Sequence, residues 1–367
     1  MIVVSMTSRR HFLLGGLCLP AAAKKAAPDR PHVVVMLTSG VGAWMPGCYG
    51  NREIRTPNID RLAQAGTRFA YSFTTAGTAP EGRAALLDGV AAALGQAGYT
   101  CGAATQGAEA CRWLEQPAGD KPFFLTVDLP LAMPVPGVPG AKSIYDQTKF
   151  DSVNYEPVAR TAAANREMFG NTVASLRRAA AAVSAMDEQV APVLDCLRRR
   201  GFVDNTLVVF TSTCGALLGR HGLWGDATAS DPPNLYDEVV AVPMIWSWPS
   251  RVPPAGVRPE LVGSRDFLPT LCELSAAALP SGAAGRSYLS LARNLPLPRK
   301  EPWRNLVFAR AGNTSMVRDN RYKLVVRSQA GGTNELFDLA ADGREKTNQY
   351  DNPQFVTVRS RLQALLK

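Results

Sequence analysis

Histidine is scarce in this chain of 367 residues, which contains only His11, His32 and His221. Zinc and copper sites depend on imidazole nitrogens, cysteine sulfurs and carboxylates at recurring spacings. The seven cysteines show no paired spacing of the kind that binds zinc. The sequence therefore excludes a histidine-rich metal hydrolase, and imidazole chemistry can have little part in the activity of the protein.

Acidic residues and long apolar runs are also limited. Lys and Arg total 40 against 31 Asp and Glu, a formal net charge of +9, which favours an anionic partner without identifying it. Nucleic-acid-binding motifs and glycine-rich phosphate loops are absent, so nucleic acid is not expected as a partner. Hydrophobic residues nevertheless make up 46% of the sequence, which is typical of a globular chain.

The first 23 residues have the pattern of a twin-arginine signal peptide. Arg9 and Arg10 precede a short apolar run at residues 13–19, and small residues follow at 20–23. A basic region, an apolar region and small residues in this order are typical of export signals. Beyond them, no stretch reaches the roughly 18 apolar residues of a membrane span. We therefore expect a periplasmic or secreted protein with no membrane span after signal removal.

Apolar runs typical of buried strands alternate with helical segments along residues 28–298. Four such runs lie at residues 32–37, 122–127, 206–211 and 239–246. Continuous apolar runs are expected for strands covered on both faces. The alternation predicts an α/β domain with a mostly parallel sheet and helices on both faces. In such sheets the site lies beyond the carboxyl ends of the strands.

Two further segments have a clear local pattern. An Ala- and Leu-rich stretch predicts a long helix from about residue 166 to 200, bent near Pro192. Short strand-like segments after residue 298, followed by a helical segment from 352, predict a C-terminal subdomain at 299–367 with a small antiparallel sheet and a helix.

The six cysteines beyond the signal are expected to be mostly buried free thiols, and only Cys101 and Cys111 are close in sequence.

Eight short motifs occur along the chain in an order that resembles one family. They are GCYGN at 47–51, TPNIDRLA at 56–63, RAALL at 83–87, AGY at 97–99, DNTLVVFTS at 204–212, HGLW at 221–224, VPMI at 242–245 and RYKL at 321–324. As a set they resemble the sulfatases of the alkaline-phosphatase superfamily. The resemblance begins near Arg30 and implies the alkaline-phosphatase-like fold.

The resemblance implies a calcium ion and a formylglycine nucleophile, and both need particular residues. The family holds calcium with an Asp-Asp pair after the first strand, where this chain has Ser39 and Gly40, and with Asp and Asn or His after a later strand, where it has Thr213 and Cys214. The nucleophile arises from Cys or Ser, and Ala79 occupies that position. We call these five residues the machinery positions. Alanine has no side-chain heteroatom, so it cannot act as a nucleophile.

Calcium takes six to eight oxygen ligands, usually with several carboxylates among them. No carboxylate lies between Arg30 and Glu53 or between Asp204 and Asp226, so a shift of one or two residues in the alignment does not supply the missing ligands. Of the residues that line the family site, Arg83 persists, together with His221. Neither calcium nor formylglycine is therefore expected as a cofactor.

Two functions remain open from the sequence. The first is a catalytically impaired pseudo-sulfatase that binds a sulfated or otherwise anionic glycan or small molecule, or a protein partner. The second is an active sulfuric ester or phosphoester hydrolase with an unrecognised site. Cys214, His221 and Asp226 form a weak candidate for a thiol triad, because spacing alone does not bring three loop residues together. The substrate and the oligomeric state are not defined by the sequence.

Overall fold

The computed structural model describes residues 30–116, 119–133, 143–151, 153, 156–249, 251–299, 301–328 and 332–366. The expected signal peptide lies outside these residues. Within the described part of the chain, no helix is long and apolar enough to cross a membrane.

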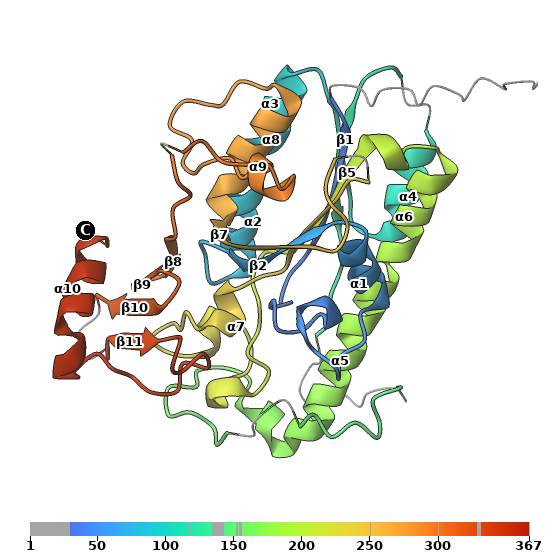
Figure 1. The fold of residues 1–367 in the computed structure, drawn as a ribbon. Helices are drawn as coiled ribbons and strands as arrows, with labels where there is room; N and C mark the ends of the chain where they lie inside the picture. Colours follow the sequence, from blue (N-terminus) through green and yellow to red (C-terminus); the bar gives the residue numbers. More distant parts are fainter. Residues whose placement is uncertain are drawn as a thin grey trace, which may run out of the picture.

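A seven-stranded sheet forms the centre of the molecule (Figure 1). Its strands are β1 (His32–Thr38), β2 (Thr67–Phe73), β3 (Thr100–Ala104), β4 (Phe123–Asp128), β5 (Thr206–Ser212), β6 (Met244–Ser247) and β7 (Gly256–Gly263). Their order is β3-β4-β1-β5-β6-β2-β7, and only β6 runs antiparallel to its neighbours. The prediction of a mostly parallel sheet is confirmed.

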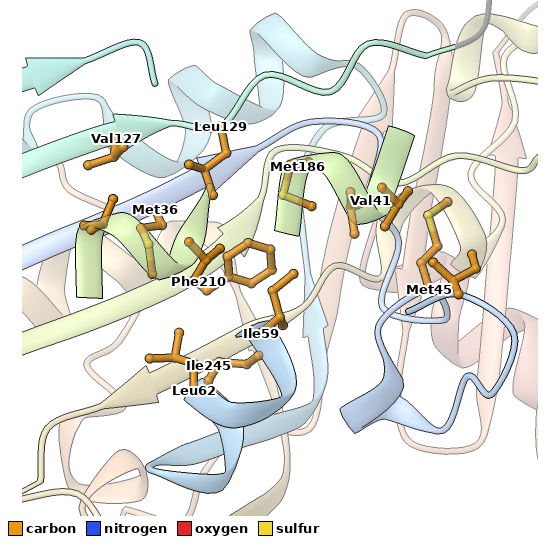
Figure 2. Packing of buried hydrophobic residues seen from close by; sticks show 14 of the residues in the cluster. Met36, Val41, Met45, Ile59, Leu62, Val127, Leu129, Met186, Phe210 and Ile245 are labelled. Atoms are coloured by element: carbon orange, nitrogen blue, oxygen red, sulfur yellow. The ribbon is translucent and has the colours of Figure 1, made fainter. Parts of the chain in front are cut away.

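Helices cover both faces of this sheet, also as predicted. One layer contains α1 (Pro57–Gln64), α4 (Gly107–Glu115), α5 (Thr172–Glu188) and α6 (Val190–Arg199), and the other contains α2 (Ala79–Leu87), α3 (Val90–Gln96), α8 (Phe267–Ser275) and α9 (Leu289–Ala292). Successive residues of β1 point to opposite layers, so its continuous apolar run supplies both cores. In Figure 2, Met36 and Phe210 of the sheet pack near Ile59 of α1 and Met186 of α5.

The long helix expected at 166–200 is divided into three pieces. Residues 166–171 form a 3₁₀ turn, η2 (Arg166–Asn171), and α5 and α6 meet at Gln189, close to the bend predicted near Pro192. Proline lacks the N–H that would bond the carbonyl four residues earlier, so it is tolerated in the first turn of a helix. The break therefore falls just before Pro192, which lies in the first turn of α6.

A second, antiparallel sheet follows, as predicted, and it has four strands. It consists of β8 (Val307–Ala311), β9 (Thr314–Arg318), β10 (Tyr322–Arg327) and β11 (Glu335–Asp338), in the order β11-β10-β9-β8. The C-terminal helix α10 (Val356–Ala364) covers it through Leu362, which packs with Val317, Leu324 and Leu336. A bridge between Ala76 and Arg310 joins this small sheet to the segment that precedes α2.

Short elements complete the described structure. They are the helix α7 (Asp237–Val240) and the 3₁₀ turns η1 (Gly47–Tyr49), η3 (Val203–Asn205), η4 (Arg220–Gly222), η5 (Ala227–Ala229), η6 (Ser264–Asp266) and η7 (Pro353–Phe355). The strand expected at 239–246 is thus wrong over residues 239–243: Val239 and Val240 belong to α7, and β6 begins only at Met244.

Candidate functional site

The carboxyl ends of β1, β4 and β5 meet at one edge of the large sheet, because these strands are parallel neighbours. Backbone hydrogen bonds join the segments that leave them. The N–H of Thr213 donates to the carbonyl of Thr38 at 2.9 Å, and the N–H of Gly40 donates to the carbonyl of Cys214 at 3.0 Å. Four of the machinery positions are therefore close neighbours at this edge.

Backbone fills much of the space behind these positions. A Cβ atom on Gly215 would lie 2.1 Å from the carbonyl oxygen of Glu238 and 2.8 Å from the Cα of Gly42. Contacts this short are possible only for glycine. The segments after β1 and β5 thus pack directly against α7.

Ala79, the fifth machinery position, begins α2 at the same edge. Gly82, three residues further on, packs on the end of β5, where an added Cβ would lie 2.0 Å from the carbonyl oxygen of Thr213. The helix therefore presents Ala79 near the expected ligand positions. The half-buried side chain there is a methyl group, so the place of the nucleophile carries no reactive atom.

Arg83 lies in α2 and forms an ion pair with Asp128, the last residue of β4. Both side chains are about two-fifths exposed, at 42% and 37%. Glu81, which could have paired with Arg83, instead accepts a hydrogen bond from the Thr78 hydroxyl at 3.1 Å. The charge that Arg83 would offer to an anion is therefore balanced by Asp128, which directly follows the apolar run at 122–127 and was not singled out from the sequence.

His221 is buried in a different environment. Its ring stacks on Tyr236 with centroids 3.7 Å apart and planes 8° apart. Its Nε2 lies 3.4 Å from Oε2 of Glu238, and its backbone N–H donates to Oε1 of Glu156 at 3.2 Å. The described contacts contain none between His221 and Arg83, so the two retained residues belong to separate clusters.

Glu238 in α7 lies beside both basic residues of η4. Arg220 donates to its Oε1 at 3.2 Å and stacks on Trp44 with its guanidinium 4.1 Å from the ring centre. Burial opposes ionisation of Glu238, but the hydrogen bond from His221 and the charges of His221 and Arg220 outweigh it and lower its pKa to about 2. His221 thus packs against the buried ion pair of Arg220 and Glu238.

The candidate thiol triad is not assembled. Burial raises the pKa of Cys214 to about 11, so the thiol is protonated at neutral pH and is a poor nucleophile. Its expected base, His221, faces Glu238, and Asp226 accepts hydrogen bonds from Thr228 at the start of η5.

The residues at the sheet edge do not fit calcium. The described residues include no group of three or more His, Cys, Asp or Glu side chains that could hold a metal ion. The hydroxyls of Thr38 and Thr213 are buried there without a hydrogen-bond partner. Two neutral hydroxyls supply neither the six to eight oxygens nor the negative charge that calcium requires.

Comparison with known proteins places this architecture in a family. The family Sulfatase matches residues 99–277, and the family described as N-sulphoglucosamine sulphohydrolase, C-terminal, matches residues 225–367. The chain belongs to the sulfatase family of the alkaline-phosphatase superfamily.

Characterised relatives match over part of their length. An N-acetylglucosamine-6-O-sulfatase of Bacteroides thetaiotaomicron is 27% identical over 198 residues, which cover 51% of this chain and 34% of the relative. A choline-sulfatase of Rhizobium meliloti is 30% identical over 187 residues, covering 50% and 35%. The chain thus spans about a third of the length of these two relatives.

Solved structures show the same fold over a larger share of the chain. A protein in complex with its substrate D-glucosamine-2-N,6-O-disulfate has a TM-score of 0.76 at 19% identity, covering 92% of this chain and 97% of that one. A phosphonate monoester hydrolase of Agrobacterium radiobacter has a TM-score of 0.76 at 17% identity, covering 92% and 95%. At these identities the similarity shows the fold alone.

Proposed function

We propose that this sulfatase-family chain is an exported protein that lacks calcium- and formylglycine-dependent hydrolysis and binds a sulfated glycan or small molecule. The machinery positions carry this proposal, because they gather at one sheet edge and contain no carboxylate. These positions offer no negative charge to offset a calcium ion, and Asp128, the carboxylate that ends β4 at the same edge, is already paired with Arg83. With a methyl group at position 79, no bond to sulfur can form there.

The anionic character of the ligand is supported by charge and by the relatives. The formal net charge of +9 favours anions in general. One relative is named for a sulfate ester of N-acetylglucosamine, and one solved structure holds a disulfated glucosamine. Export is supported by the arginine pair and apolar run within residues 1–23.

Arg83 is the residue proposed to bind the sulfate group. A guanidinium presents parallel N–H donors that match two oxygens of a tetrahedral anion. Asp128 competes for the same donors, and both side chains are exposed enough for exchange. A sulfate group would therefore replace Asp128 as the partner of Arg83.

Titration calorimetry with glucosamine 6-sulfate at physiological salt tests the binding step. We expect Arg83→Ala to weaken binding by about 10- to 100-fold, since a hydrogen bond to a charged group contributes about 1.5–3 kcal/mol. Asp128→Asn should tighten binding, because it removes the competing carboxylate. Arg199→Ala is the matched control, because Arg199 pairs with Glu115 at the end of α6 and its loss changes the net charge equally.

Equal weakening of binding by Arg83→Ala and Arg199→Ala would assign the affinity to general charge, and the absence of any binding would overturn the ligand proposal.

Hydrolysis is tested separately with an aryl sulfate, an aryl phosphate and the sulfated sugar in the presence of calcium. We expect no turnover above background and no stoichiometric calcium. Turnover that disappears in Arg83→Ala would establish the alternative, an active hydrolase.

A further inference from the structure

Helices α4 and α6 are in close contact along one seam. Near the start of the seam, a Cβ atom on Gly107 would lie 2.6 Å from the carbonyl oxygen of Gln189, so only glycine permits this approach. At its far end, Oε1 of Glu115 lies 3.6 Å from a guanidinium nitrogen of Arg199. The two helices therefore run alongside each other with the same direction and register over about two turns.

Two cysteines lie in the middle of this seam. Cys111 is one turn beyond Gly107 in α4, and Cys196 is one turn before Arg199 in α6. The sulfur of Cys196 is 3.7 Å from the carbonyl oxygen of Cys111, and the sulfur of Cys111 is 3.2 Å from the carbonyl oxygen of Pro192. Each thiol thus points across the interface at the other helix.

The two thiols also differ in access. Cys196 is buried, whereas Cys111 is partly exposed. Burial, the charge of the Cys196 thiolate and a hydrogen bond with Cys196 raise the pKa of Cys111 to about 11. Reaction with an oxidant in solution would therefore begin at Cys111 and be slow near neutral pH.

Two further cysteines in the described part of the chain, Cys101 and Cys272, lie next to carbonyl oxygens of other segments. Cys101, which is close to Cys111 in sequence, bonds instead to the carbonyl of Ala91 in α3 at 3.4 Å. Helix α3 lies in the opposite layer from α4. Cys272 contacts the carbonyl of Ala278 at 3.8 Å. The pair that is near in sequence is therefore separated by the sheet.

We propose that Cys111 and Cys196 form a disulfide that joins α4 to α6. The Cys111 thiolate attacks a low-molecular-weight disulfide such as oxidised glutathione, forming a mixed disulfide and releasing one glutathione thiolate. The Cys196 thiolate then attacks the sulfur of Cys111, forms the protein disulfide and releases the second glutathione as a thiolate. Two thiol protons and two electrons leave the protein, and one glutathione disulfide becomes two glutathione molecules.

The full chain, folded and exposed to excess oxidised glutathione at pH 8.5, tests the proposal. After alkylation and digestion without reductant, mass spectrometry should detect a peptide that links Cys111 to Cys196. The bridge itself should remove two of the seven cysteines from the thiols that can be titrated in denaturant. The bridge should raise the melting temperature by about 5–10 °C, because it closes a long loop in the unfolded chain. Its rate of formation should rise about tenfold per pH unit from 7 to 9, following the thiolate fraction.

Variants assign the result to this pair. Cys196→Ala should retain glutathione on Cys111, and Cys111→Ser should remove the linked peptide, whereas Cys272→Ala should leave it unchanged. The proposal is overturned if the wild-type chain keeps glutathione on Cys111 without a bridge, or if Cys111 links to Cys101. These outcomes are independent of whether the chain binds or hydrolyses a sulfate ester.

Discussion

His32, at the start of β1, is held in its neutral form by burial and by its contacts with Phe123. Its ring stacks on Phe123 with centroids 4.0 Å apart, and its Nδ1 accepts a hydrogen bond from the backbone N–H of Phe123 at 3.1 Å. Burial lowers the pKa of His32 from 6.5 to about 4. Protonation of Nδ1 would charge a partly buried ring and remove the acceptor of this bond.

This environment predicts a loss of stability in mild acid. Because the native state binds fewer protons than the unfolded state between pH 6.5 and about 4, the contribution of His32 is present above pH 6.5 and is lost as the pH falls toward 4. With solvent screening of a partly exposed ring, the loss should be about 1–2 kcal/mol. Urea denaturation at several pH values between 4 and 7 measures it.

His32→Asn serves as the comparison, since asparagine is neutral throughout and retains an acceptor oxygen. The difference in unfolding free energy between wild type and variant should shrink or reverse as the pH falls from 6.5 to 4. A constant difference over this range would contradict the prediction.

At the level of single residues, the sequence predicted where site residues lie in the fold better than it predicted which side chains they contact. Strand ends are visible in the order of apolar runs, so the neighbourhood of Thr213 and Gly40 was predictable. The partners of Arg83 and His221 were not, because Asp128 and Glu238 reach them through tertiary contacts. Alternating burial reveals which face a residue occupies, but not which distant side chain meets it.

Helix α2 depends on one glycine for its position on the sheet edge. At Gly82, an added methyl group would collide with the carbonyl of Thr213, 2.0 Å away. Helix propensity alone would favour alanine over glycine by roughly 0.5–1 kcal/mol. Because the carbonyl is fixed by β5, the collision should dominate, and α2 would have to move.

We therefore expect Gly82→Ala to lower the free energy of unfolding by about 1–3 kcal/mol, as overpacking of a well-packed interior does. Gly170→Ala is the control, because its Cβ would meet no atom within 4 Å. Thermal and denaturant unfolding of both variants provide the measurement. An unchanged or increased stability in Gly82→Ala would show that α2 can shift at little cost.

At the level of elements, the sequence predicted most buried strands but neither the direction of β6 nor the helix α7. A strand covered on both faces is apolar whichever way it runs, so hydrophobicity carries no information on direction. Val239 and Val240 are buried in α7, and four residues are too few for a helical period to distinguish them from a strand. The division at Gln189 was easier to predict, because Pro192 lies in the first turn of α6.

Across the whole molecule, Lys323 connects the small sheet to the large domain. It is fully buried, with Nζ 2.9 Å from Oδ1 of Asp237 in α7 and 2.6 Å from Oε1 of Glu345. Arg318 pairs with the other oxygen of Asp237. Burial lowers the pKa of Lys323 and raises that of Glu345 to about 7, while the attraction between them opposes both changes.

Removal of this cation should destabilise the protein strongly. Lys323→Met leaves Asp237 and Glu345 with less positive charge in a buried site, and breaking a buried pair on one side costs about 3–5 kcal/mol. Lys346→Met is the matched control, because Lys346 pairs with Glu156 nearer the surface and should cost less than about 1 kcal/mol. Denaturant unfolding compares the two, and similar small losses would contradict a role for Lys323 in joining the sheets.

The close packing at the strand ends also determines the order in which this edge could change during evolution. Thr213 and Cys214 are buried and held by backbone hydrogen bonds to the last residue of β1, Thr38, and to Gly40 just beyond it. A single carboxylate at either position would be a buried charge without a cation, at a cost of several kcal/mol. Only several acidic residues together with an ion could offset that cost. A lineage that accumulates one substitution at a time therefore loses stability before it gains a metal site. The present residues at this sheet edge are thus more easily retained than replaced by metal ligands.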